Sequence, residues 1–356
     1  MLKKLLPQNQ THPALVTAAF IIIIAGIMQA QSMITQGLMS LFIGIICIQP
    51  VRWLQKKKVP QGIAVLIVLI AISGLFVGFG GLIGSSLSSF SNEAPLYAEN
   101  LKEMGDSLIK TLEGRGIEIS TEELSNILNP GRVMSFTAGF LGQLGGFMGN
   151  ALTIFFLVLF LLLEVDGIVV KIRAVVTDEE DTSNYLGKIM NNIRSYLSIK
   201  TLTSLFTGLL IWVALLVIGV DYAILWALIA FLLNYIPNIG SILAALPAVL
   251  FSLIQLGGAG AAWTTVVFVV ANMIVGNVIE PKMMGKGLGL STFIIFFALI
   301  FWGFVLGTIG MFLSVPLTMI IKIILDHNPK TKPIAIFLGS EQEAQIVLDE
   351  KNKKKK

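Results

Sequence analysis

The chain has 356 residues, of which 55% are hydrophobic and only 13% are charged, and its mean hydropathy is +0.85. Soluble domains have roughly 45–50% apolar and about 25% charged residues, so this composition excludes an ordinary soluble protein and indicates an integral membrane protein. The net charge of +4 does not indicate nucleic-acid binding, because the basic residues lie beside apolar runs and at the tail, as the positive-inside rule describes.

Residue types that catalyse reactions or bind metals are scarce. The single cysteine, Cys47, lies within an apolar run, and the two histidines, His12 and His327, lie at the edges of such runs. No group of His, Cys and carboxylate residues has the spacing of a metal site or a catalytic triad. We therefore expect no enzyme activity, no metal and no cofactor.

Three apolar runs open the chain and predict transmembrane helices in residues 1–84. They are Ala14 to Ala30, Met33 to Ile48 and Gly62 to Gly84. The loop VRWLQKKKVP between the second and third runs carries four basic residues and no acid, which places it in the cytoplasm. Two crossings before this loop place the N-terminus in the cytoplasm as well.

Residues 85–147 form a polar segment with eight acidic and four basic residues, which indicates that it faces outward. Apolar side chains recur in it every three or four residues and predict an amphipathic helix: Tyr97, Leu101, Met104, Leu108 and Leu112. Ser120 and Glu123 have the spacing of a capping box for a second, shorter helix. A helical hairpin on the outer rim is favoured over a ligand-binding domain.

The main transmembrane region is expected over residues 148–330. A fourth span from Asn150 to Leu163 precedes a cytoplasmic amphipathic helix within residues 164–200, and a fifth span runs from Leu202 to Val220. Five short apolar segments follow: Tyr222 to Leu233, Ile239 to Leu256, Ala261 to Ile279, Leu290 to Val305 and Ile309 to Leu325. Several fall below the roughly 20 residues that cross a bilayer.

These lengths predict an all-α protein with about eight transmembrane helices plus short broken or re-entrant helical hairpins. Ten crossings result if every short segment spans the membrane. Either number keeps the C-terminal tail, residues 331–356, in the cytoplasm, where its lysines belong.

The stretch FLLNYIPNIGSIL interrupts the apolar region with five candidate site residues: Asn234, Pro237, Asn238, Gly240 and Ser241. If the stretch is helical, Pro237 frees the carbonyl of Leu233, and Gly240 permits a positive φ and close backbone approach. Asn234 and Asn238 either satisfy freed backbone groups or bind a polar solute, and the residue pattern leaves both roles open. A broken helix in a membrane must be sheltered by protein or line a cavity.

A second stretch, FWGFVLGTIGMFL, resembles the first at an offset of seventy residues and adds Thr308 and Gly310 as candidates. The two share the first Phe, an Ile-Gly pair and the last Leu, although chance similarity between apolar segments competes with a true repeat. Three crossings between the copies would make them an inverted repeat, which is typical of secondary transporters.

Three polar residues and a proline interrupt another apolar stretch: Asn272, Asn277, Glu280 and Pro281. The helix is expected to end near Pro281. A buried carboxylate within a membrane is costly and usually functional, so Glu280 is a candidate for coupling to H⁺ or Na⁺. The alternative is an interfacial ion pair with Lys282 or Lys286.

The motifs LLNYIPNIG and GNVIEPKMMGKGLGLS, preceded by YLSIKTLTSLFTGLL and followed by GTIGMFLSVPL, resemble the autoinducer-2 exporter (AI-2E) family. The resemblance runs from about Ala14 to Leu325. It implies a permease of the bacterial cytoplasmic membrane with an elevator-like architecture that assembles as a homo-oligomer, plausibly a pentamer. Members are linked to autoinducer-2 export or to Na⁺(Li⁺)/H⁺ antiport. Thr292 and Phe293 replace the His-Pro or similar pair of many members, which weakens any claim of an identical substrate.

We therefore expect a secondary transporter that moves a small polar solute across the lipid bilayer by alternating access, with autoinducer-2 export as one candidate activity. Na⁺(Li⁺)/H⁺ antiport is the first alternative. A channel or a non-transporting envelope assembly protein is the second, because a permease fold does not by itself establish transport.

Overall fold

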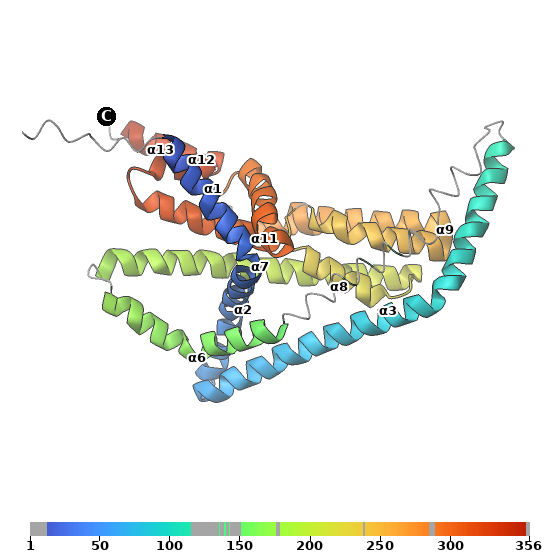
Figure 1. Ribbon diagram of the computed structural model, residues 1–356, viewed down its shortest axis with the longest axis horizontal. Helices are drawn as coiled ribbons and strands as arrows, with labels where there is room; N and C mark the ends of the chain where they lie inside the picture. The colour runs from blue at the N-terminus through green and yellow to red at the C-terminus, as the bar shows by residue number, and fades with distance from the viewer. Residues whose placement is uncertain are drawn as a thin grey trace, which may run out of the picture.

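The computed structural model describes the chain in five ranges and three isolated residues. They are 13–114, 151–175, 179–237, 239–284 and 289–353, with 135, 139 and 142. All regular elements in these ranges are helices (Figure 1). Five of the described helices are long and apolar enough to cross a membrane, and three shorter apolar helices accompany them. The expected all-α, multi-pass membrane protein is confirmed, whereas eight crossings and an elevator architecture stay predictions.

The N-terminal region consists of α1 (Pro13–Gln29), α2 (Gln31–Lys56) and α3 (Gln61–Glu113). Helix α2 continues past Pro50 and takes in most of the basic stretch that was expected to form a loop. The turn between α2 and α3 is short, and Lys58 adopts a positive φ of 67° in it.

Helix α3 differs from its prediction, because 53 residues form one uninterrupted helix of roughly 80 Å. The expected end at the glycine cluster after Gly80 was wrong, since a helix in lipid must keep its backbone hydrogen bonds internal. The predicted amphipathic helix is instead the second part of α3, which continues through Pro95 and extends beyond the body of the protein (Figure 1). The capping box at Ser120 and Glu123 lies outside the described residues.

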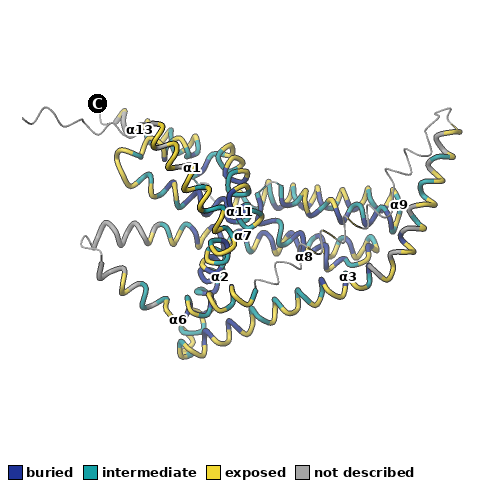
Figure 2. The backbone as a smooth tube through the Cα atoms, in the orientation of Figure 1, coloured by how far each residue is buried: buried dark blue, intermediate teal, exposed yellow. Residues whose placement is uncertain are grey.

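Two long helices follow, α6 (Ala151–Val175) and α7 (Glu179–Ile218). The amphipathic segment expected before the fifth span is not a separate helix, because α7 contains both segments without a break. Its apolar residues Ile193 and Leu197 are buried in a core cluster with α2 and α11, and its cytoplasmic location stays a prediction. Figure 2 shows the dark, buried positions concentrated where α7 passes the centre of the molecule.

Helices α8 (Ala223–Leu233) and α9 (Gly240–Ile274) form a hairpin whose turn is the NYIPNI segment. The hairpin is antiparallel, because the ring of Phe251 in α9 lies 5.6 Å from that of Trp226 near the start of α8. Helix α9 itself reverses at Gly257, which has φ 73° and ψ −166°.

The reversal of α9 brings its two arms together, so that the Thr264 hydroxyl donates to Ser252 Oγ at 2.9 Å. Glycine is needed at this tip because a positive φ with this ψ is accessible essentially only to glycine. The apolar segments expected from Ile239 to Leu256 and from Ala261 to Ile279 are these two arms.

The chain then passes through a π-helical turn, η2 (Val275–Ile279), into α10 (Glu280–Met284). The helix was expected to end near Pro281 but continues to Met284. A π-turn pairs each amide with a carbonyl five residues earlier and widens the helix, and such turns are frequent at functional sites.

Helix α11 (Thr292–His327) reverses at Gly307, with φ 67° and ψ −154°. The Trp302 indole in its first arm donates to Thr318 Oγ1 in the second arm at 3.1 Å. Two short helices, α12 (Lys332–Leu338) and α13 (Glu341–Lys353), complete the chain.

Three buried apolar clusters hold these helices together. One joins α3, α7, α8 and α9, a second joins α2, α7 and α11, and a third joins α2, α3 and α6. Helix α7 is shared by the first two clusters, so its central turns lie between the α8–α9 hairpin and α11.

Candidate functional site

A stripe of polar side chains follows one side of α7 through the middle of the molecule. Its members recur every three or four residues: Tyr196, Lys200, Thr203, Ser204 and Thr207. All five are buried, and none is more than 3% exposed. A polar stripe buried in an apolar protein needs partners on the neighbouring elements.

The strongest partner contact is an ion pair between Lys200 and Glu280. Lys200 Nζ lies 2.7 Å from Oε1 and 2.9 Å from Oε2 of Glu280, and the two side chains are 4% and 18% exposed. Of the two expected partners of Glu280, Lys282 is exposed and does not form this pair, and Lys286 lies outside the described residues. Removing one member of a buried pair typically costs about 3–5 kcal/mol, because the other charge is left uncompensated.

The turn between α8 and α9 contacts the same side of α7. Asn234 is buried and donates through Nδ2 to Ser204 Oγ at 3.0 Å, and the Tyr235 hydroxyl donates to Thr201 Oγ1 at 2.7 Å. Asn234 therefore holds the turn against α7 through a side chain and not through the freed backbone. Asn238, the other candidate asparagine, lies outside the described residues.

The backbone of this turn satisfies itself locally. The carbonyl of Leu233, which Pro237 was expected to free, accepts from the Ile236 amide at 2.8 Å, and the Gly240 amide donates to the Ile236 carbonyl at 3.2 Å. Pro237 is half-buried, and its carbonyl accepts from the Ile239 amide at 2.6 Å. Pro237 therefore shapes the turn.

Gly240 and Gly310 permit equivalent close approaches in the two related stretches. A Cβ at Gly240 would lie 1.8 Å from the carbonyl oxygen of Leu233, and one at Gly310 would lie 1.9 Å from that of Trp302. The predicted close approach at Gly240 is confirmed, whereas a positive φ there is not, since Gly257 and Gly307 are the glycines of α9 and α11 with that geometry.

The two related stretches meet in space. The ring of Tyr235, in the first turn, stacks on the ring of Phe312, just after the reversal of α11, with centroids 4.6 Å apart. This contact, together with the matching glycines, supports a relationship between FLLNYIPNIGSIL and FWGFVLGTIGMFL. Their inverted orientation across a membrane stays a prediction.

The remaining candidates divide between buried and exposed positions. Ser241 Oγ is buried and, among the described residues, has no hydrogen-bond partner. Asn272 is half-buried, with Oδ1 3.1 Å from where a Gly276 Cβ would lie. The rest are exposed on the outside of the helices and are not brought to the polar stripe: Asn277, Pro281 and Thr308.

A cavity of about 300 Å³ lies one helical turn along α7 from the ion pair. Tyr196 lines it, and the buried Tyr196 hydroxyl has no hydrogen-bond partner among the described residues. Lys322 of α11 also lines it, and its ammonium contacts the carbonyl of Gly289 and the carboxylate of Glu343 in α13. The cavity is therefore lined by both polar and apolar side chains and is bounded on one side by α13.

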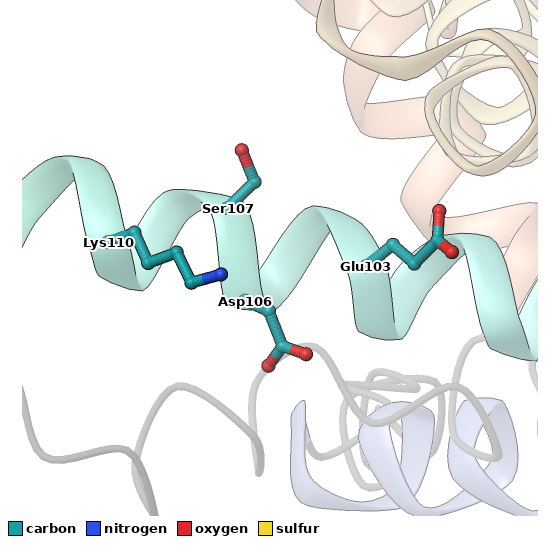
Figure 3. A pocket seen from close by; sticks show the side chains of 4 residues that line it. All are labelled: Glu103, Asp106, Ser107 and Lys110. Carbon is teal, nitrogen blue, oxygen red and sulfur yellow. The ribbon is translucent and has the colours of Figure 1, made fainter.

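A hollow of about 450 Å³ on the projecting part of α3 is a poorer candidate. Figure 3 shows that its four lining side chains come from this one helix and point in different directions: Glu103, Asp106, Ser107 and Lys110. A surface built by one helix cannot enclose a solute, so the described residues form no binding site at this hollow.

A second polar cluster joins the part of α3 around Pro95, which still packs against the body, to the start of α8. The Glu93 carboxylate accepts from the hydroxyls of Tyr97 at 2.6 Å and Tyr222 at 2.7 Å. These hydrogen bonds lower the pKa of Glu93. Partial burial, followed by the hydrogen bond to Glu93, raises the pKa of Tyr222 to about 12, and burial raises the pKa of Asp221 beside them.

Sequence reasoning missed several members of the site: Tyr196, Lys200, Thr201, Ser204, Tyr235, Phe312, Lys322 and Glu343. The polar spacing along YLSIKTLTSLFT was the available signal, because an amphipathic pattern inside an apolar helix predicts a buried polar face. Nothing in the sequence identified Lys200 as the partner of Glu280, eighty residues away. Among the described residues, no group of three or more His, Cys, Asp or Glu side chains could hold a metal.

Comparisons with known proteins identify the family of the chain. A family model described as "AI-2E family transporter" matches residues 17–330. The chain is 34% identical over 339 residues to the AI-2 transport protein TqsA of Escherichia coli K12, covering 95% of the chain and 98% of TqsA. A Haemophilus influenzae protein named provisionally as a transport protein is 38% identical over 333 residues, covering 92% of the chain and 95% of that protein.

Proposed function

Because the chain belongs to the AI-2E transporter family, we propose that it is a secondary transporter that carries a small polar solute across the bacterial cytoplasmic membrane by alternating access. The observation that carries the proposal is the buried polar stripe of α7, which pairs with Glu280 and with the turn between α8 and α9. Intramembrane charged and polar groups of this kind mark solute or ion pathways.

The solute site of this proposal lies where the two related stretches meet α7. Asn234 and Tyr235 present the turn, and Lys200 and Glu280 supply the charges. Ser241 contributes a buried hydroxyl that has no partner in the part of the chain that the structure describes. A buried polar atom without a partner costs about 1–3 kcal/mol, which a bound solute or water recovers. Asn272 lies at the edge of this site, and Gly240 and Gly310 let the backbones approach.

The cavity beside Tyr196 is the access route from one side of the membrane in this proposal. It lies one helical turn from Lys200 and is bounded by Glu343 of α13. The positive-inside rule places the C-terminal lysines, and therefore this mouth, in the cytoplasm. The proposal also includes assembly as a homo-oligomer, which the family resemblance implies is a pentamer. Transport in this proposal uses an elevator-like movement of the hairpins.

Autoinducer-2 is the candidate solute that the relatives favour, since TqsA is named as an AI-2 transport protein and matches along nearly its whole length. Na⁺(Li⁺)/H⁺ antiport has less support, because the carboxylate of Glu280 is already bound to a cation of the protein. A channel or an assembly protein would not need this buried ion pair.

Reconstitution of the full chain into liposomes tests the proposal. The expected result is flux of autoinducer-2 above that of protein-free liposomes, and no Na⁺- or Li⁺-dependent proton movement. Equal autoinducer-2 flux with and without protein would contradict the autoinducer-2 assignment. Proton movement driven by Na⁺ or Li⁺ would instead favour the antiporter.

A further inference from the structure

In the Lys200–Glu280 pair, each buried charge is compensated by the other inside the protein. Both carboxylate oxygens of Glu280 lie within 2.9 Å of one ammonium, and Lys200 is 3% exposed. The pair joins two different elements, since Lys200 lies in the middle of α7 and Glu280 begins α10 directly after the π-turn. The pair therefore depends on how η2 and α10 sit against α7.

Among the described residues, the other charged and titratable groups nearby leave this compensation to Lys200. Lys282, on the same short helix as Glu280, is exposed. The hydroxyls of Tyr196 on α7 and Tyr235 in the turn between α8 and α9 are uncharged neighbours. Across the cavity, the ammonium of Lys322 is occupied by Glu343 and the Gly289 carbonyl, with Asp326 one turn further along α11.

A carrier with a buried carboxylate must neutralise it whenever it changes conformation, because an uncompensated charge in a membrane interior costs several kcal/mol. Bound Na⁺ or H⁺ performs this task in ion-coupled carriers, which thereby acquire their ion requirement. Here an ammonium of the chain already occupies that position. Because this ammonium belongs to the side chain of Lys200, it cannot diffuse away and is present in every transport cycle.

We infer that Lys200 is a built-in counter-cation for Glu280, which frees the transport cycle from any requirement for Na⁺, Li⁺ or H⁺ at this site. The inference rests on the proposed transporter function, and it assigns Lys200 as a positioning residue that acts through Glu280. The class of cation that Glu280 accepts in place of Lys200 is a small monovalent cation or a proton.

Lys200→Gln is the decisive variant, because it removes the cation and keeps a hydrogen-bonding side chain of similar length. Autoinducer-2 flux into liposomes without Na⁺ should fall about tenfold at neutral pH, because Glu280 is then left without a counter-cation. Flux should recover when Na⁺ or Li⁺ is added or when the pH is lowered, because these cations then neutralise Glu280. The parent protein should change less than about twofold across the same conditions.

The double variant Lys200→Gln with Glu280→Gln is the matched control. It leaves no charge to compensate, so its flux should be independent of Na⁺, Li⁺ and pH. Cation dependence that persists in the double variant, or a Lys200→Gln protein without cation dependence, would contradict the inference.

Thermal unfolding of the purified full chain provides a readout that needs no transport. Na⁺ and Li⁺ should leave the melting temperature of the parent unchanged and raise that of Lys200→Gln, because a cation that binds the folded state stabilises it. A parent protein that is stabilised by Na⁺ or Li⁺ overturns the inference even if Lys200→Gln fails to fold. Absence of autoinducer-2 flux with the expected melting behaviour would instead contradict only the solute assignment.

Discussion

The ring of Tyr235 stacks on the ring of Phe312, with planes inclined by 22° and centroids 4.6 Å apart. Tyr235 belongs to the turn between α8 and α9, and Phe312 follows the reversal of α11, so one aromatic contact joins the two interruptions of the apolar region. The Tyr235 hydroxyl also donates to Thr201 of α7. Any movement of one hairpin relative to the other must change this contact.

Bridging this contact is expected to stop transport. In a Cys47→Ala background, which removes the only cysteine, Tyr235→Cys combined with Phe312→Cys should bind Hg²⁺ between the two thiols. Autoinducer-2 flux should then fall to the level of protein-free liposomes and return when excess thiol removes the mercury. Single-cysteine proteins, treated in the same way, are the controls. Undiminished flux from a fully bridged protein would show that the two turns do not separate during transport.

The hydrogen bond between Asn234 and Ser204 is expected to position the turn for transport. Asn234→Ala should lower flux, with expression and oligomer size near those of the parent, and should cost about 1 kcal/mol of stability for the lost hydrogen bond. Ser204→Ala should have a similar effect, and the double variant should lose little more, because both changes remove one interaction.

Asn277→Ala is the matched control for this series, since Asn277 is a polar residue of the same region whose side chain is exposed. Its flux should equal that of the parent. If Asn234→Ala transports like the parent, the turn is not part of the solute site. Strictly additive losses in the double variant would show that the two residues act separately.

Alanine at Gly240 or Gly310 is expected to destabilise the protein by more than about 2 kcal/mol, as strained or overpacked sites do. In each case the added Cβ would lie less than 2 Å from a backbone carbonyl oxygen, of Leu233 or Trp302, and a backbone atom cannot move aside as a flexible side chain can. Gly74→Ala in α3 is the control, because its Cβ would meet nothing within 4 Å. Thermal unfolding in detergent measures the three variants, and equal melting temperatures would contradict the close approach.

Acid is expected to loosen the contact between the part of α3 around Pro95 and α8. The hydrogen bonds from Tyr97 and Tyr222 lower the pKa of Glu93 below its ordinary value of 4.5 in the folded protein. A carboxyl group with a lowered pKa stabilises the folded state above its ordinary pKa, and this contribution is lost as the pH falls through the lowered value. The loss therefore falls in the acid range below 4.5.

Glu93→Gln should remove this acid-dependent component of the melting temperature, because glutamine does not titrate. Glu99→Gln is the control, since Glu99 lies on the same helix and is exposed. The neighbouring Asp221 has a raised pKa and contributes with the opposite sign, so the difference between the parent and Glu93→Gln is the quantity to compare. Identical pH profiles for the two proteins would show that the hydrogen bonds do not stabilise the contact.

Sequence reasoning identified the helical membrane fold and the interruptions because both follow from local composition. Apolar length predicts a helix in lipid, and the Pro and Gly residues of NYIPNIG and GTIG mark the places where the chain turns. The continuity of long helices through residues that disfavour a helix was harder to predict. The glycine cluster that begins at Gly80 predicted a helix end, yet α3 runs through it, since lipid penalises an unpaired backbone more strongly than it penalises glycine.

The site was predicted only in part for a similar reason. Asn234 and Glu280 stand out because each is polar within an apolar run. Their partners Ser204 and Lys200 lie on another helix, and pairing across 30 or 80 residues depends on tertiary packing that no local pattern encodes. The sequence could not distinguish exposed candidates such as Asn277 and Thr308 from buried ones. The π-turn and the reversal at Gly307 change which side of the helix a residue occupies, so regular helical spacing no longer predicts burial there.

Loosening α13 is expected to open the cavity beside Tyr196. Glu343 attaches this helix to the buried Lys322, so Glu343→Gln removes the charge that holds the two together. Maleimide labelling of Met319→Cys, a buried lining position, in a Cys47→Ala background should then become several times faster. Glu341→Gln, an exposed change in the first turn of the same helix, should leave the labelling rate unchanged. Equal rates in all three proteins would show that the ion pair does not control access, and that α13 covers the cavity by packing alone.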